Sequence, residues 1–426
     1  MKELIKYLIS IAFSIFIGCI DFFPPNVSII KPQDGERVEN HFVIEVQVKD
    51  NMNLDDKVEI YIDDNLVTTL SSPYIYDAWI GGKSCSFSLF AKAYDLGGNW
   101  KKSEEITLNY FSLTEMGSCD LPDIGKEIII QGNYAYISYG SNSINSGLAV
   151  IDISNPANPV QAGRYIAPSS AQGLDISGDH VFIAFMNRLT IVNVSNPSTP
   201  YEVASYEPPA SGAQIYDVVI EGNYAYVAGV DSYSEKGGFW VIDISNPWSP
   251  LEIGHCATDE SPRPLISLIE SGNYVYSICG FAQTGKMVII DISVPSSPSV
   301  TKELVLPCYV NLIKSNHFLF FPNKDLYVYD VSDPLNPVEI ASCNLPNTSA
   351  KGVAVSGEYA YISCYPFTEG KELWKVRVSN PTQMFISGYY NIAGENRLPV
   401  TNIAVSGKYA YVTTENRKLV IVKIIE

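Results

Sequence analysis

The chain has 426 residues, of which 46% are hydrophobic and 17% are charged, and its formal net charge is −18. This length exceeds that of one ordinary domain and predicts two domains, and the apolar content excludes an intrinsically disordered chain. The negative charge excludes nucleic acid and an anionic bilayer surface as direct ligands, because both would repel the protein.

The first residues have the pattern of an export signal. Two lysines precede a short apolar run over residues 7–17, and a Gly-Cys pair follows it. This order predicts a signal peptide over residues 1–18. Residues 16–19 resemble the lipobox of bacterial lipoproteins, although phenylalanine replaces the usual leucine at the first position. The resemblance implies that Cys19 is lipidated and that residues 19–25 form a tether, and a plain signal peptide or an uncleaved anchor is the alternative.

Residues 26–110 alternate strand patterns with turns. Runs in which apolar and polar residues alternate over at least part of their length predict strands at 42–48, 57–62 and 86–94. Turn residues separate them at 32–35, 63–65 and 95–99. The motifs Pro32/Asp34/Gly35, Val58-Glu-Ile-Tyr-Ile-Asp63 and Ala91-Lys-Ala-Tyr-Asp95 with Asn99 resemble bacterial immunoglobulin-like domains. That resemblance implies a β-sandwich that acts as a spacer.

Residues 111–426 contain seven copies of one repeat. Each copy has a short phrase such as Gly222-Asn-Tyr-Ala-Tyr226, followed by an apolar run that ends in a Ser-Asn-Pro turn, as in Gly238-Phe-Trp-Val-Ile-Asp-Ile-Ser-Asn-Pro247. The turn residue that opens the phrase recurs every 42 to 50 residues, at Gly132, Gly178, Gly222, Gly272, Ser315, Gly357 and Gly407. A repeat of this length made of short strands is typical of a β-propeller blade.

The second copy predicts four strands per blade. Its strand-like runs are 173–177, 180–185, 188–194 and 201–206. Gly178-Asp179 suits a two-residue hairpin, because glycine tolerates a positive φ at its first position. The seventh copy ends after its third strand, and residues 112–118 match the fourth strands of other copies. We therefore predict an all-β chain whose seven-bladed propeller is closed by this N-terminal strand.

The repeated phrases also carry a family resemblance. Leu148-Ala-Val-Ile-Asp152, Trp240-Val-Ile-Asp243 and Leu419-Val-Ile-Val422, each preceded by Gly-x-Tyr-Ala-Tyr, resemble the LVIVD repeats of bacterial and archaeal surface propellers. The resemblance covers roughly residues 112–426. It implies a propeller and an exported location, and it implies no reaction, so no catalytic residue is carried over.

Motifs for metal or catalytic chemistry are missing from the sequence. The eight cysteines include no C-x-x-C pair, and no H-x-x-H, HExxH, G-x-S-x-G or P-loop motif occurs. The aspartates before the Ser-Asn-Pro-type turns, such as Asp152 and Asp243, are interpreted as hydrogen-bonding the turn backbone rather than a metal. The tyrosines of the Gly-x-Tyr-Ala-Tyr phrase are interpreted as packing between blades rather than stacking on a ligand. We predict no cofactor, with one open alternative: calcium bound by Asp63, Asp64, Asp95 and Asn99, which otherwise cap turns.

The central channel offers one set of candidate residues. Alignment of the first strands places two rings near its mouth: Lys126, Gln172, Tyr216, Ile266, Tyr309, Lys351 and Thr401, then Glu127, Gly173, Asp217, Ser267, Val310, Gly352 and Asn402. The channel candidates chosen from them are Lys126, Glu127, Gln172, Asp217, Lys351 and Asn402. Glu127 and Asp217 are the carboxylate pair that the alignment brings to one cavity, so glycosidase chemistry is an alternative to a solvated channel.

The loops give the second set. Loops between the second and third strands vary widely in length between copies, whereas the first hairpin and the Ser-Asn-Pro turn do not. Variable loops on one face often mark a binding face. The candidate binding residues on that face are Tyr139, Tyr233, Phe281, Tyr365 and Phe367, which we expect outside strand interiors. Loop drift with self-packed aromatics is the alternative.

The sequence thus predicts an exported, lipid-anchored surface protein whose propeller is a binding scaffold presented by an immunoglobulin-like spacer. The expected partner is a surface protein or a glycan on the variable-loop face, and contact with the membrane is through the lipid anchor only. The alternative is a glycan-active hydrolase or lyase that uses the acidic channel.

Overall fold

The computed structural model describes residues 23–424 apart from 39–40, 51–53, 80–85, 96, 111–112, 142–144, 168, 211, 232–235, 259–263, 280–284, 307–311, 347, 367–371 and 393–398. The chain divides into two compact units at residues 112 and 113. The predicted signal peptide and Cys19 lie outside the described residues. In the described part of the chain, no helical segment has the length and apolar character needed to cross a bilayer.

The first unit is a sandwich of two sheets. One sheet has the order β1 (Asn26–Lys31), β3 (His41–Lys49) and β6 (Ile75–Trp79). The other has the order β2 (Arg37–Val38), β9 (Ile106–Tyr110), β7 (Ser86–Asp95), β4 (Leu54–Ile62) and β5 (Asn65–Leu70), with β8 (Trp100–Lys102) also paired to β7. The three predicted strands are β3, β4 and β7. Their alternate apolar residues, including Ile44, Ile60 and Leu89, meet in the core between the sheets.

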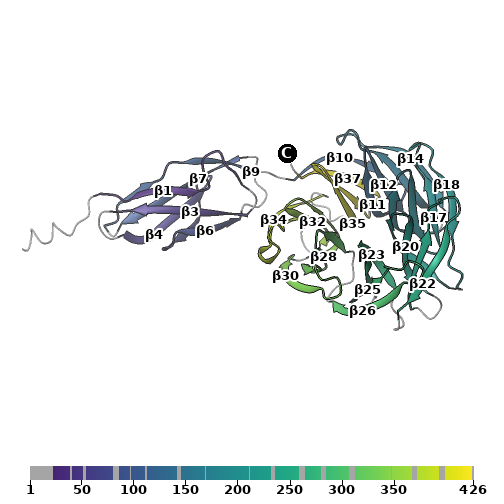
Figure 1. Ribbon diagram of the computed structural model, residues 1–426. Coiled ribbons are helices and arrows are strands. Elements are labelled where there is room, and N and C mark those ends of the chain that lie inside the picture. Colours follow the sequence, from purple (N-terminus) through teal and green to yellow (C-terminus); the bar gives the residue numbers. More distant parts are fainter. Residues whose placement is uncertain are drawn as a thin grey trace, which may run out of the picture. The chain divides into compact units, whose positions relative to one another are not determined.

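The second unit is a set of seven four-stranded antiparallel sheets, one for each repeat (Figure 1). The first blade consists of β11 (Gly125–Gln131), β12 (Tyr134–Tyr139), β13 (Ser146–Asp152) and β14 (Val160–Ala167). The second consists of β15 (Ala171–Ser177), β16 (His180–Phe185), β17 (Arg188–Asn193) and β18 (Tyr201–Tyr206). The third consists of β19 (Gln214–Glu221), β20 (Tyr224–Val230), β21 (Gly237–Asp243) and β22 (Leu251–Ala257). The four strands predicted for the second copy are confirmed.

The later blades repeat the same order. The fourth blade consists of β23 (Leu265–Ser271), β24 (Tyr274–Cys279), β25 (Gly285–Asp291) and β26 (Ser299–Leu306). The fifth consists of β27 (Ile313–Ser315), β28 (Phe318–Pro322), β29 (Asp325–Asp330) and β30 (Val338–Asn344). The sixth consists of β31 (Thr348–Ser356), β32 (Tyr359–Pro366), β33 (Leu373–Arg377) and β34 (Phe385–Tyr390). A short 3-10 helix, η1 (Pro381–Gln383), precedes β34.

The seventh blade takes its fourth strand from the start of the unit. It consists of β35 (Val400–Ser406), β36 (Tyr409–Thr414), β37 (Lys418–Lys423) and β10 (Thr114–Asp120), which pairs antiparallel with β37. Figure 1 shows β10 beside β37, near β35 and β11. The predicted closing strand is therefore confirmed, with the pairing covering residues 114–120. The Asn402 side chain amide also donates to the Lys126 carbonyl at 3.0 Å, which joins the last blade to the first.

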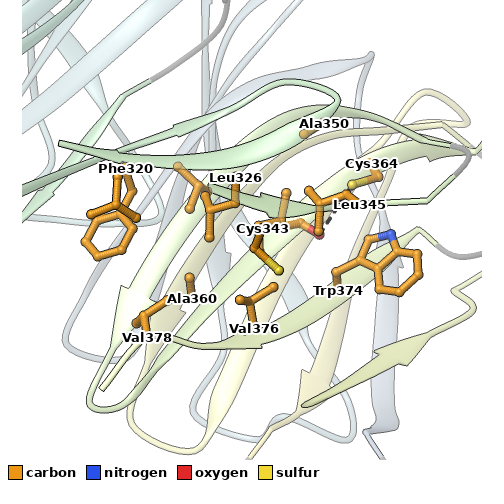
Figure 2. Packing of buried hydrophobic residues seen from close by; sticks show 13 residues of the cluster. Phe320, Leu326, Cys343, Leu345, Ala350, Ala360, Cys364, Trp374, Val376 and Val378 are labelled. Atoms are coloured by element: carbon orange, nitrogen blue, oxygen red, sulfur yellow. Dashed lines mark hydrogen bonds between the residues drawn. The ribbon is translucent and has the colours of Figure 1, made fainter. Parts of the chain in front are cut away.

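The core lies between neighbouring blades rather than inside any one of them. The third strands are almost fully buried, as expected for strands covered on both faces. Figure 2 shows one such layer, in which Phe320 and Leu326 of the fifth blade lie with Trp374 and Val376 of the sixth. The second tyrosine of the repeat phrase packs in these layers, with Tyr136 and Tyr226 each 3% exposed. The interpretation that these tyrosines pack between blades is confirmed.

The first hairpin of each blade turns on a residue with positive φ. The φ values are +59° at Gly132, +55° at Gly178 and +58° at Gly222. In the fifth blade the corresponding residue is Asn316, with φ +55°, and Ser315 ends β27. Asparagine tolerates this conformation better than serine does. The alignment of Ser315 with the turn glycines was therefore wrong by one residue.

Candidate functional site

A β-bulge in the first strand of the blades shapes the mouth of the channel. In six blades the structure describes this part of the first strand, and in each the pairing of the first strand with the second shifts by one residue. The skipped positions are Lys126, Gln172–Gly173, Tyr216, Ile266, Lys351 and Thr401. A bulge turns its extra side chain out of the regular alternation. These positions coincide with the first ring read from the sequence, which gave no sign of the bulges themselves.

Hydroxyl side chains from the second strands support the bulges. The Glu127 amide donates to the Ser138 Oγ at 3.1 Å, and this hydroxyl donates to the Gln172 carbonyl of the next blade at 2.6 Å. The Ser277 hydroxyl donates instead within its own blade, to the Ser267 carbonyl at 2.9 Å. Ser138 and Ser277 are fully buried. The signal in the sequence is a serine or threonine inside an otherwise apolar strand, and these residues were not among the predicted site residues.

The bulges enclose a cavity of about 250 Å³, here called the mouth cavity. Its lining residues are Lys126, Glu127, Gln172, Gly173, Tyr216, Asp217, Ile266 and Asn402. All eight lie near the beginning of their strands, whereas the Gly-containing hairpins lie at the other ends. The mouth cavity therefore opens at the end of the channel that carries the inter-blade loops and the loops between second and third strands. Of the predicted channel residues, Lys351 is exposed and does not line it.

The two carboxyl groups of the cavity join neighbouring blades. The Glu127 Oε2 accepts a hydrogen bond from the Leu174 amide of the second blade at 2.8 Å. The Asp217 Oδ2 accepts one from the Leu268 amide of the fourth blade at 2.7 Å, and its Oδ1 accepts from the Val218 amide at 2.9 Å. Both groups are thus hydrogen-bonded to main-chain donors, which fixes their positions at the channel wall.

The second blade differs from this pattern because it has glycine at the equivalent position. A Cβ atom on Gly173 would come within 2.1 Å of the Asp217 Oδ1, so this glycine leaves room for the carboxyl group. The link to the third blade comes instead from Asp175, whose Oδ2 accepts from the Ile220 amide at 2.7 Å. Asp175 was not among the predicted site residues, because it lies two positions beyond the aligned ring that contains Gly173.

Burial raises the pKa values of all three carboxyl groups, and neighbouring negative charges add to the shift at Glu127 and Asp217. Burial raises the pKa of Glu127 well above its usual range, and the negative charges of Asp217 and Asp175 add to the effect. Burial raises the pKa of Asp217 to about 7 despite its two amide donors, with a contribution from Asp175. Burial also raises the pKa of Asp175. The mouth cavity therefore holds acid groups that keep protons at higher pH than ordinary carboxyls do.

The candidate residues of the loop face do not form one cluster in the described part of the chain. Tyr139 is the last residue of β12 and is fully buried in the layer between the first and last blades, so it is not available on the binding face. Tyr365 also belongs to a strand, β32, and is 40% exposed. Tyr233, Phe281 and Phe367 lie outside the described residues. A tyrosine after a long apolar run reads as loop from sequence, but the second strand continues to it.

The recurring aspartates cap the turns that follow them. The Ser154 amide donates to Asp152 at 2.9 Å and the Ser245 amide donates to Asp243 at 2.9 Å. These bonds lower the pKa values of both carboxyls. The turn interpretation is confirmed.

In the first unit, Asp95 accepts from the Asn99 amide at 2.7 Å and from its side chain at 2.8 Å. Asp63 accepts from the Ser88 amide at 3.0 Å. The bonds of Asp95 cap its own turn, and the bond of Asp63 ties the turn after β4 to strand β7. Throughout the described residues, no group of three His, Cys, Asp or Glu side chains is placed to hold a metal ion. Calcium at these positions stays an untested alternative to the prediction of no cofactor.

In comparisons with known proteins, the two units match different family models. The bacterial Ig domain model matches residues 25–81. No curated protein sequence matches the chain. Among solved structures, BamB from Moraxella catarrhalis is similar at 12% sequence identity and a TM-score of 0.46, over 74% of this chain and 98% of that one.

The second unit matches a repeat model throughout. The LVIVD repeat model matches residues 125–167, 168–207, 213–258, 267–304, 318–345, 348–392 and 399–424. These seven segments coincide with the seven blades and together cover more than half of the chain. The protein therefore belongs to the LVIVD repeat family.

Proposed function

We propose that this protein is a binding scaffold whose ligand site is the mouth cavity together with the loops around it. The observation that carries the proposal is the hydrogen bonding of Glu127 and Asp217, which accept from main-chain amides of neighbouring blades. These bonds hold neighbouring blades together, so the two carboxyl groups have a structural role that explains their presence without catalysis. We therefore favour recognition of a ligand over glycan cleavage.

The lining suits a small ligand or one end of a larger one. Tyr216 and Ile266 offer apolar surface, and Gln172, Lys126 and Glu127 offer polar groups in a cavity of about 250 Å³. Pockets that bind small molecules combine apolar walls with a few placed polar groups in this way. A surface protein that inserts a side chain, or a glycan that inserts a sugar, would satisfy the same description.

The rest of the chain supports a location in the cell envelope. The first unit matches a bacterial Ig domain, and the N-terminal residues have the pattern of a lipoprotein signal. In this proposal Cys19 carries the lipid, and the first unit is a spacer between the lipid and the propeller. Two or three acyl chains on one cysteine suffice for stable anchoring, whereas one chain gives only marginal binding.

The test is to capture ligands from purified cell-wall glycans and from envelope proteins on immobilised protein. We expect Tyr216→Ala combined with Gln172→Ala to reduce retention at least about tenfold with little change in melting temperature, because both side chains face the cavity rather than a core layer. Trp248→Ala is the matched control, since Trp248 is 60% exposed in a turn at the opposite end of the channel.

The same samples distinguish binding from catalysis. New reducing ends or unsaturated sugars in the incubated glycans, lost in Glu127→Gln, would support the hydrolase or lyase alternative and contradict the scaffold. Equal loss of retention in Trp248→Ala and in the cavity variant would contradict the proposal that the ligand site is the mouth cavity.

A further inference from the structure

The carboxyl groups of the mouth cavity lack a cation of their own. The charges that act on Glu127 are those of Asp217 and Asp175, and both are negative. Among the described residues, no lysine or arginine forms an ion pair with any of the three, and this includes the adjacent Lys126. Buried carboxylates without a cation either hold protons or take a positive partner from outside, because an isolated buried charge is costly.

The cavity keeps these groups within reach of a ligand. Asp217 is 9% exposed, and Gly173 next to it has no side chain to cover its carboxyl group. Glu127 uses one oxygen for the Leu174 amide, and its other oxygen makes no hydrogen bond with the described residues. Each ionised carboxylate offers about four acceptor positions, so the amide bonds leave positions for a further donor.

The remaining lining favours an organic cation. Tyr216 borders the cavity beside Asp217, and an aromatic ring attracts a cation placed over its face. Ile266 adds an apolar wall that would contact carbon atoms around a charged nitrogen. A metal ion would need a closed shell of oxygens, and no metal-binding group of His, Cys, Asp or Glu occurs in the described residues.

We propose that the mouth cavity binds its ligand through an ammonium group, which lies beside the carboxyl groups of Glu127 and Asp217 and against the ring of Tyr216. This inference rests on the proposed function, since it names the chemistry of the ligand at the same site. Binding exchanges protons for the cation: the carboxyls that hold protons in the empty cavity release them to the solvent when the ammonium arrives.

The exchange predicts how affinity depends on pH. The titratable groups at the site are Lys126 and Glu127 on β11, Asp175 on β15, and Tyr216 and Asp217 on β19, whereas β23 and β35 contribute Ile266 and Asn402. Since Asp217 has a pKa of about 7, protons compete with the cation below that value. Affinity for an ammonium ligand should rise from pH 5.5 to pH 8, and calorimetry in buffers of different ionisation enthalpy should record proton release.

The experiment uses choline and ethanolamine as cationic probes and dimethylbutanol, the uncharged carbon isostere of choline, as their neutral counterpart. At pH 8 we expect choline or ethanolamine to bind the full-length protein at least about tenfold more tightly than dimethylbutanol. Glu127→Gln should remove most of this preference, because glutamine keeps an oxygen for the Leu174 amide but carries no charge. Glu339→Gln is the control, since Glu339 is on an outer strand and accepts from Tyr329.

The outcomes separate this inference from the proposed function. If neither cation binds, or if neutral and cationic probes bind equally, the ammonium inference is wrong. Retention of envelope ligands that still depends on Tyr216 and Gln172 would then leave the scaffold function standing. If the cations bind as expected while those substitutions leave retention unchanged, the proposed function is wrong and the ammonium site stands.

Discussion

Glu127 and Asp217 each join two blades and at the same time line the cavity. Their hydrogen bonds to the Leu174 and Leu268 amides stabilise the channel wall, but burial makes ionisation of both carboxyls costly. An acid whose pKa is raised on folding keeps its proton in the folded state at pH values at which the unfolded chain has already lost it. Its contribution to stability therefore falls as the pH rises from about 4 through the folded-state pKa. Near neutral pH, burial of these two carboxyl groups therefore lowers the free energy of unfolding.

Replacement of Glu127 by glutamine tests this cost. We expect the free energy of unfolding of Glu127→Gln, relative to wild type, to increase between pH 5 and pH 8, by about 1.4 kcal/mol for each unit by which folding raises the pKa. Urea denaturation at several pH values measures it. Asp243→Asn is a control of opposite sign, because hydrogen bonds to Ser245 lower the pKa of Asp243 and its stabilisation is lost only in acid. A pH-independent difference for Glu127→Gln would contradict the argument.

The strand β10 is the element on which ring closure depends. It pairs with β37 along residues 114–120, and Met116 and Cys119 pack into the layer between the first and last blades. Without it, β37 would expose an unpaired edge and the layer would lose one wall. Closure by a strand distant in sequence makes the seam a contact between the two ends of the unit.

Deletion of residues 112–118 should abolish the cooperative unfolding transition of the propeller, observed by circular dichroism during heating. The reason is that the last blade would then have three strands and an open edge. A deletion variant with the melting curve of the parent would show that the ring does not need this strand.

A milder change in the same strand probes its packing. A Cβ atom on Gly117 would approach the backbone of the first Ser-Asn-Pro-type turn, at 2.7 Å from the Ala157 and Pro156 carbonyl oxygens. Gly117→Val should therefore lower the free energy of unfolding by about 1–3 kcal/mol. The neighbouring Ser118 is exposed, and Ser118→Val should change it by less than about 0.5 kcal/mol.

At the scale of the whole molecule, the chain combines an Ig-type unit with a seven-bladed propeller that presents its cavity at the loop end. The net charge of −18 favours solubility and attracts cations to the protein. Both features agree with a scaffold that is held at the envelope and binds a positively charged group.

Anchoring through Cys19 gives a direct prediction. Cys19→Ser should move the protein from the membrane fraction to the soluble fraction of cell extracts, detected by immunoblotting, because the proposed acyl chains on Cys19 would provide the attachment. Cys119→Ser is the control, since Cys119 packs inside the propeller. Unchanged membrane partition of Cys19→Ser would indicate an uncleaved anchor instead.

The sequence by itself determined the repeat architecture, the blade strands and the closing strand. Each blade is specified by residues close together in the chain, such as a turn glycine, alternating apolar residues and an aspartate that caps its own turn. It also placed Lys126, Glu127, Gln172, Asp217 and Asn402 near one channel mouth, because a fixed repeat carries equivalent positions to equivalent places.

Only the tertiary structure decided what those residues do. The bulges, the space that Gly173 leaves for Asp217, the link made by Asp175 and the burial of Tyr139 all depend on the neighbouring blade, and an alignment of repeats treats each blade alone. The one-residue error at Ser315 has a local origin, since the hairpin needs a residue with positive φ and that residue is Asn316. Contacts between repeats vary with each pair of neighbours, whereas the pattern within a repeat does not.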